Sequence, residues 1–239
     1  MLQRTLCRAA LAAGLLALGL VTAAPAQDTK PSAADQAKAR KALQDVQDFI
    51  GTWNLEGTQK DGGKTIAWKE QVKWGWKFGK DGDAWVAVEF ADKKGKYFTT
   101  GELKYDVAKK LYALTLTPSA KGATPQTYTG ALKSGVLKVE YKDEKTKDVY
   151  RLTMNTTNDG IRFAFKAEKQ DGGKGLFASA YAMNGNKDGE SIAGGAKKPE
   201  CVVSGGAATM PVTYNGKTYY VCCSGCRDEF NANPAKYAK

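Results

Sequence analysis

Residues 66–78 read IAWKEQVKWGWKF, and this stretch decides the fold of most of the chain. Apolar side chains stand on alternating positions, interleaved with Lys, Glu and Gln: Ile66, Trp68, Val72, Trp74, Trp76 and Phe78. A period of two places these side chains on one face of an extended segment. The stretch therefore predicts a β-strand with one apolar face and one polar face.

The same period recurs downstream in runs that are separated by turn residues. The runs lie at 86–90, 112–116, 137–141, 150–154, 161–165 and 176–183. The turn signals are Asp61-Gly62-Gly63, Lys93-Lys94-Gly95, Ser134-Gly135, Asn158-Asp159-Gly160 and Asp171-Gly172-Gly173. Roughly nine or ten short strands with tight connections predict an antiparallel meander. Closure into a barrel over residues 51–183 would remove the exposed edges, and a β-sandwich is the alternative.

Upstream of the strands, residues 27–50 predict a leader and one amphipathic helix. Apolar residues recur at helical spacing between Ala33 and Ile50, and Gly51 is a natural stop. The barrel is therefore expected to follow directly on a helix.

The first 26 residues have the features of a signal peptide. Arg4 and Arg8 precede an apolar run from Ala9 to Val21, and Ala24-Pro25-Ala26 has the small-x-small pattern of a cleavage site. The run is shorter than the ~20 residues of a membrane span, and no later segment resembles one. We therefore expect an exported, periplasmic protein with no transmembrane segment after cleavage.

Cysteine is confined to one end of the expected mature chain. Cys7 leaves with the signal peptide, and no residue from Gln27 to Glu200 is a cysteine. Residues 184–200 are rich in Gly, Lys and Asn and predict a linker. Residues 201–239 then form a unit of their own, which holds all the remaining thiols: Cys201, Cys222, Cys223 and Cys226.

This C-terminal unit predicts a β-hairpin followed by a short helix. Asn215-Gly216 supplies the positive backbone angles of a tight hairpin turn. Ser224 is the expected N-cap of the helix, Phe230 its buried anchor, and Pro234 lies beyond its end. The small module is thus expected to be of ββα type.

A unit of about forty residues with so few large apolar side chains cannot bury enough surface to offset its chain entropy. A metal ion or disulfides would hold it together. Tetrahedral thiolate sites suit Zn(II), and soft sulfur also selects Cu(I).

The order of these residues resembles a TRASH/YHS-type domain. Cys201 is followed, after twenty residues, by the pair Cys222-x3-Cys226, and the segment continues to Asn233-Pro234-Ala235-Lys236-Tyr237. That family is linked to the trafficking, resistance and sensing of heavy metals, so the resemblance implies that Cys201, Cys222 and Cys226 are metal ligands. Cys223 is then a spare ligand or a capture thiol.

Two departures from the family pattern concern the ligands. Val202 stands where the family often has Pro, and the His that gives YHS domains their name is absent, as is every other His. A fourth ligand would have to be Cys223, a carboxylate, solvent or a partner.

In an exported protein the thiols have two alternative uses, disulfide bonds and redox chemistry. Four cysteines in an oxidising compartment normally pair as disulfides, of which a Cys222–Cys223 bridge is the most strained of the possible pairings. A redox role has only the spacing of Cys223-Ser224-Gly225-Cys226 in its favour.

The strand region resembles a lipocalin-like (calycin) barrel. Gly51-Thr52-Trp53 matches the Gly-x-Trp start of that family, and Tyr105-Asp106 with Leu111-Tyr112 looks like an uncharacterised bacterial branch of it. The resemblance implies that Trp53 packs across the closed end.

A barrel of this size can enclose one small apolar ligand. Five tryptophans could line such a pocket or simply form the core: Trp53, Trp68, Trp74, Trp76 and Trp85. Haem binding through His, as in the related nitrobindins, cannot apply here.

Composition argues against other classes of protein. The 239 residues carry a net charge of +11, which falls to +9 when Arg4 and Arg8 leave, and a solvated lysine surface explains it. Export and the absence of a recognition module argue against nucleic acid. Without His, the commonest general base is missing, and we expect no enzymatic activity.

The expected fold is therefore mainly β, with an antiparallel lipocalin-like barrel, an N-terminal helix and a linked ββα cysteine module. The expected function is metal binding by an exported protein, with Zn(II) or Cu(I) on thiolates in heavy-metal handling or sensing. The alternative is a carrier of a small apolar ligand whose C-terminal module is stapled by disulfides.

Overall fold

The computed structural model describes residues 31–189 and 199–238. The expected signal peptide, with Cys7, and the central part of the expected linker lie outside the described residues. Within the described part of the chain, no helix has the length and hydropathy of a membrane span.

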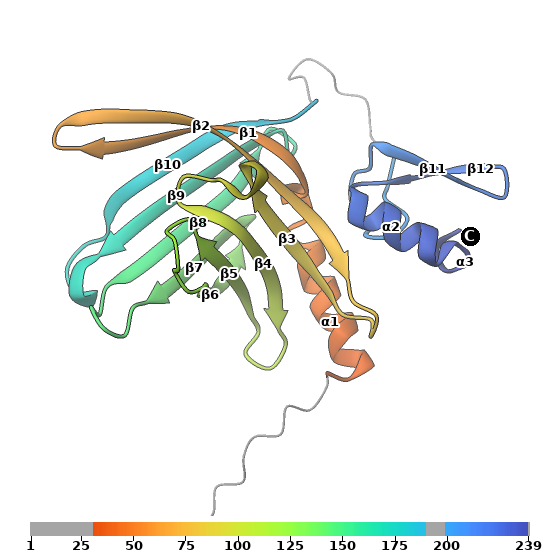
Figure 1. The fold of residues 1–239 in the computed structure, drawn as a ribbon. Helices are drawn as coiled ribbons and strands as arrows, with labels where there is room; N and C mark the ends of the chain where they lie inside the picture. Colours follow the sequence, from red (N-terminus) through yellow and green to blue (C-terminus); the bar gives the residue numbers. More distant parts are fainter. Residues whose placement is uncertain (1–30, 190–198, 239) are drawn as a thin grey trace, which may run out of the picture. The chain divides into compact units, whose positions relative to one another are not determined.

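Ten antiparallel strands close into a barrel, as predicted, in the order β1-β10-β9-β8-β7-β6-β5-β4-β3-β2 (Figure 1). The alternation of apolar and polar residues along each strand fills the interior and leaves the other face to solvent. The strands are β1 (Gly51–Asp61), β2 (Lys64–Phe78), β3 (Ala84–Phe90), β4 (Phe98–Asp106), β5 (Leu111–Pro118), β6 (Gln126–Lys133), β7 (Val136–Lys142), β8 (Val149–Thr157), β9 (Arg162–Gln170) and β10 (Ala178–Lys187). Short 3-10 turns, η2 (Ala91–Lys93) and η3 (Asp171–Gly173), follow β3 and β9.

The barrel closes where its first strand meets its last. Trp53 pairs with Lys187 and Thr58 with Ala182 across this seam. The alternating pattern ends at Met183, yet β10 continues to Lys187, because the polar residues that follow still pair their backbone with β1. At its other end the strand begins at Ala178, and Leu176, which starts the alternating run in the sequence, is 93% exposed.

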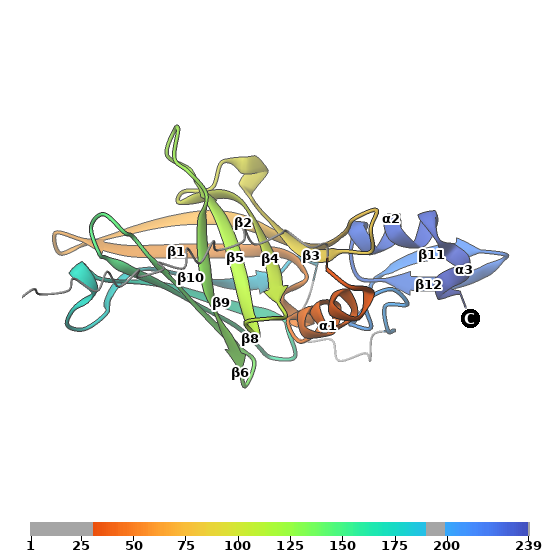
Figure 2. The ribbon, with the colours of Figure 1, turned by 90° about the horizontal axis from the view of Figure 1, so that it is seen from below.

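The N-terminal helix is shorter than the sequence predicts. Helix α1 (Ala33–Gln44) begins after Ser32, whose hydroxyl accepts a hydrogen bond from the backbone N–H of Asp35 at 3.1 Å. The chain then makes the 3-10 turn η1 (Gln47–Phe49) instead of continuing as one helix to Ile50. Both views place α1 beside β3 and β4 (Figures 1 and 2), which it contacts.

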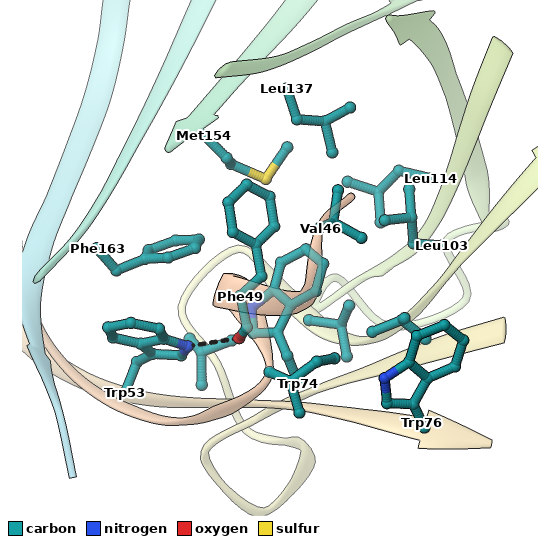
Figure 3. Packing of buried hydrophobic residues seen from close by; sticks show 14 of the residues in the cluster. Val46, Phe49, Trp53, Trp74, Trp76, Leu103, Leu114, Leu137, Met154 and Phe163 are labelled. Atoms are coloured by element: carbon teal, nitrogen blue, oxygen red, sulfur yellow. Dashed lines mark hydrogen bonds between the residues drawn. The ribbon is translucent and has the colours of Figure 1, made fainter. Parts of the chain in front are cut away.

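The change from helix to 3-10 turn inserts apolar side chains into one end of the barrel. Val46, Phe49 and Ile50 are all buried there. Phe49 makes edge contacts with Trp74 and Phe163, at ring-centroid distances of 5.6 and 5.4 Å (Figure 3). This end of the barrel is therefore closed by packed side chains.

Trp53 connects the 3-10 turn η1 to strand β1. Its indole N–H donates a hydrogen bond to the carbonyl of Phe49 at 2.8 Å (Figure 3), and the side chain is fully buried. Trp74 and Trp76 are buried as well, whereas Trp68 and Trp85 are half-buried. Trp53, Trp74 and Trp76 are thus members of the core.

The C-terminal module has the predicted ββα form. It contains β11 (Met210–Tyr214), β12 (Lys217–Val221), α2 (Ser224–Ala232) and the short α3 (Pro234–Tyr237). Asn215 and Gly216 adopt φ of 49° and 74°, which gives the predicted tight turn between the two strands. Phe230 is buried, with its ring centroid 5.5 Å from that of Tyr219.

Candidate metal centre

Cys201 lies in a tight loop that immediately precedes the hairpin. Its N–H donates to the carbonyl of Gly206 at 2.6 Å, and the N–H of Gly205 donates to the carbonyl of Cys201 at 2.8 Å. The N–H of Ser204 points at the sulfur, with a distance of 3.4 Å from N to Sγ. Gly205, with φ of +79°, lets the chain turn back this sharply. The loop therefore supplies a backbone donor that stabilises a thiolate at Cys201.

Cys222 and Cys226 flank the start of α2. Cys222 follows directly on β12, and Cys226 is in the first turn of the helix, where the partial positive charge of the helix N-terminus favours a thiolate. The prediction that Ser224 caps this helix is wrong by one residue. The cap is Cys223, whose backbone is extended (φ −158°, ψ 169°), and Ser224 is already helical.

The hairpin, the loop and the helix bring three sulfurs together. The Sγ atoms of Cys201, Cys222 and Cys226 all lie within 4.8 Å of one another, and those of Cys222 and Cys226 are 3.5 Å apart. Thiolates bound tetrahedrally to zinc at ~2.3 Å are about 3.8 Å from each other. The three thiols therefore fit a single thiophilic ion.

Cys223 is placed differently. It is buried beside the group, but it is not one of the three thiols that lie within 4.8 Å of one another. The pKa of Cys223 is lowered to about 3, chiefly by its contacts with the thiols of Cys222 and Cys226 and further by the backbone N–H groups of Cys226 and Trp76. Cys223 therefore touches the group without belonging to it.

The neighbouring thiols also set the protonation of the three-sulfur group. Hydrogen bonds from Cys222 and Cys226 hold the pKa of Cys201 well below its usual range. The pKa of Cys226 is raised, first by its contact with Cys201 and further by its other thiol neighbours and by burial. All four cysteines are free thiols, so the described residues contain no disulfide.

Several contacts around the site had no signal in the sequence. The guanidinium of Arg40 donates to the carbonyl of Val203 at 2.6 Å, and the side-chain amide of Gln44 donates to the carbonyl of Ser204 at 2.9 Å. Both come from α1, more than 150 residues away along the chain, and hold the Cys201 loop. The hydroxyl of Ser204 also lies 3.3 Å from the sulfur of Cys222.

A glycine lets the module approach the barrel closely. A Cβ atom on Gly225 would clash with the backbone oxygen of Trp76. The described residues 31–189 and 199–238 belong to one compact unit, and these contacts join the barrel and the module within it. A long-range contact of this kind depends on both surfaces and leaves no local pattern.

Comparison with known proteins agrees with the domain assignment. Residues 203–239 match the model of the YHS domain family. No curated protein matches the chain. Among solved structures, that of Rv2717c from M. tuberculosis is 16% identical, with a TM-score of 0.41, and the match covers 62% of this chain and 97% of that one.

The barrel and the module can thus be assigned separately. The closed ten-stranded barrel is consistent with a calycin-like fold. Cys201 lies two residues before the span matched by the family, and Cys222 and Cys226 lie inside it. Residues 203–239 match the YHS domain family, and Cys222 and Cys226 of this span join Cys201 in a group compatible with a metal ion.

Proposed function

We propose that this is an exported metal-binding protein that holds one thiophilic ion, Zn(II) or Cu(I), for heavy-metal handling or sensing. The observation that carries the proposal is the group of three sulfurs within 4.8 Å of one another. Cys201, Cys222 and Cys226 would bind the ion as thiolates, and the protein would act by binding it and not by catalysis.

The donor chemistry supports this choice of cargo. Thiolates select Zn(II), Cu(I) and similar soft ions, whereas Mg(II) and Ca(II) require oxygen ligands. The chain contains no His, so sulfur is the only soft donor that it offers. The N–H of Ser204 and the first turn of α2 both stabilise negative charge on the sulfurs.

Export is supported by the N-terminal sequence. Arg4 and Arg8, the apolar run from Ala9 to Val21 and the Ala24-Pro25-Ala26 site together have the order of a signal peptide. In a periplasmic setting the ion would also protect the thiols from pairing, because sulfurs that ligate a metal are not available as nucleophiles.

Metal analysis and thiol counting on the purified protein test the proposal. We expect about one equivalent of Zn or Cu in the wild type, with loss of nearly all of it in Cys222→Ser and Cys226→Ser. Cys223→Ser is the matched control, since it removes an adjacent buried thiol from outside the three-sulfur group. A wild-type protein with two disulfides and no metal would sink the proposal.

The barrel favours a second candidate function, the carriage of a small molecule. The hydroxyl of Tyr181 is buried and has no hydrogen-bond partner among the described residues, although buried polar groups are normally satisfied. Tyr181 and Gln59 also line part of a pocket of about 450 Å³. A ligand with a polar group could satisfy this hydroxyl.

Native mass spectrometry tests this second function. We expect a co-purifying small molecule on the wild-type protein and a lower occupancy on Tyr181→Phe. A wild-type mass equal to that of the polypeptide plus its metal would argue against a carrier.

A further inference from the structure

The three-sulfur group can be approached from one side. Cys201 and Cys226 are 1% and 0% exposed, whereas Cys222 is partly exposed. Cys222 also lines a pocket of about 290 Å³, together with Cys223, Ser224 and Met210. A small molecule from solvent would therefore meet the group at Cys222, through this pocket.

The opposite wall of the pocket comes from the barrel and carries charged side chains. Lys73 of β2 and Lys187 of β10 line it. One acid, Asp188, lines it too, and its carboxylate accepts a hydrogen bond from the side-chain amide of Asn54 at 3.0 Å. Lys187 lies over the ring of Trp53, with its ammonium 5.0 Å from the centroid. Lys73 thus places a positive charge on the barrel side of this pocket.

The net charge of the metal-loaded site explains why a lysine on the pocket wall matters. Three thiolates carry three negative charges, so that with Zn(II) or Cu(I) the group remains anionic. Three donors are also one fewer than the four that zinc takes in structural sites. A zinc-loaded site thus has room for one further ligand, and Lys73 on the pocket wall offsets part of the charge that such a ligand adds.

We propose that the pocket admits a small thiolate from outside the chain, which binds the ion held by Cys201, Cys222 and Cys226 as its fourth ligand. This rests on the proposed metal-binding function and assigns its exchange partner, a low-molecular-weight thiol. In the exchange one metal–sulfur bond forms, the proton of the incoming thiol goes to solvent, and no atom changes oxidation state. The ion can then leave with the incoming thiolate as the protein thiolates release it.

Two residues of the chain are rivals for the fourth position. Cys223 lines the pocket with a buried thiol, which is not one of the three thiols that lie within 4.8 Å of one another. Met210 lines the pocket with a thioether, which is a neutral donor.

Cobalt(II) substitution tests the proposal, because sulfur-to-cobalt charge transfer in the near ultraviolet scales with the number of thiolates. The protein is reduced with a thiol-free phosphine, loaded with Co(II), and titrated with 2-mercaptoethanol, with ethylene glycol as the thiol-free control. We expect the wild-type intensity to rise by about one third as three thiolates become four. Ethylene glycol should leave it unchanged.

Charge reversal of one pocket lysine provides the specificity control. Lys73→Glu should raise the half-maximal concentration of 2-mercaptoethanol about 3- to 10-fold, as expected for one charge close to an anion. Lys77→Glu should have little effect, since Lys77 is an exposed residue of the same strand that does not line this pocket. Equal effects of the two variants would overturn the role of the pocket.

The remaining outcomes separate this inference from the function on which it rests. If the wild type already shows four thiolates and Cys223→Ser shows three, Cys223 is the fourth ligand and the inference is wrong. If the wild type ignores 2-mercaptoethanol and Met210→Leu responds to it, the thioether occupies the position and the inference is again wrong. A wild type without thiolate charge transfer would overturn the metal site itself.

Discussion

The barrel and the C-terminal module differ in the side chains that they offer to stabilise a fold. The barrel surrounds many large apolar side chains, and residues 51–187 contain no cysteine. The module buries far fewer large side chains, chiefly Val212, Val221 and Phe230, and instead brings three thiols together. Small domains often have too little interior to be stable by apolar burial alone, and a metal site can supply the difference.

Removal of the metal should have the largest effect, because it should unfold the C-terminal module while the barrel stays folded. Chelation is expected to abolish amide-exchange protection in β11, β12 and α2, because binding of the ion is coupled to folding of a module this small. The barrel strands should keep their protection. Exchange monitored by mass spectrometry measures both at once.

The Cys223→Ser protein is the control for this experiment and should behave as the wild type before and after chelation. A reduced apo-protein that retained protection in α2 would contradict the comparison, since apolar packing would then suffice in both regions.

Truncation of the barrel core should come next in size. Trp53→Ala removes a fully buried indole and its hydrogen bond to Phe49, and should lower the free energy of unfolding by ~3–5 kcal/mol. Trp85→Ala, at a half-buried position, should cost less than ~1.5 kcal/mol. Urea denaturation followed by circular dichroism measures both, and equal costs would show that Trp53 is not a core residue.

Loss of a contact between α1 and the Cys201 loop should have a smaller effect. It tests whether the metal site depends on residues outside the C-terminal module. Arg40→Ala removes a charged donor from the carbonyl of Val203, and should weaken metal binding by ~1–2 kcal/mol, or about 5- to 30-fold. Competition with a chromophoric chelator measures the affinity. Lys38→Ala, on the same helix in an exposed pair with Asp35, should leave the affinity unchanged. An unchanged affinity in Arg40→Ala would make the module independent of the barrel.

The smallest effect should appear at alkaline pH, in the barrel alone. Burial, with a lesser contribution from Asp45, raises the pKa of Tyr112 to about 12 in the folded protein, and its hydroxyl donates to the carbonyl of Ala42 at 2.7 Å. Because the unfolded value is lower, near 10, the contribution of Tyr112 to stability is complete below pH 10 and is lost as the pH rises towards 12. Urea midpoints measured from pH 9 to 12 should therefore fall less steeply for Tyr112→Phe than for the wild type. Equal slopes would mean that Tyr112 does not titrate between those limits.

The sequence predicted most of the fold because alternation and turn residues are local signals. The period of two in β2 and the Asn215-Gly216 turn are examples, and both are confirmed. The end of α1 could not be predicted, because the apolar spacing up to Ile50 fits both a helix and the 3-10 plug that the barrel requires. Polar strand ends such as Asn184 to Lys187 show no alternation, so only their pairing with β1 reveals them.

The sequence predicted which side chains supply the donor atoms of the candidate site. The spacing of Cys201, Cys222 and Cys226 indicates a group, and the structure brings these three sulfurs together. The roles of Arg40 and Gln44 and the pocket at Lys73 arise from contacts between distant segments. Arginine, lysine and glutamine on a surface are too common for such contacts to be read from sequence.

The seam of the barrel also sets an order of events during synthesis. Because Trp53 pairs with Lys187, the ring cannot close until the chain has emerged through Lys187. Distant pairings of this kind are slow to form. In a chain that emerges N-terminus first, Cys201, Cys222 and Cys226 appear only after the last barrel strand. The C-terminal module is thus synthesised after all the barrel strands, including β2, which α2 contacts.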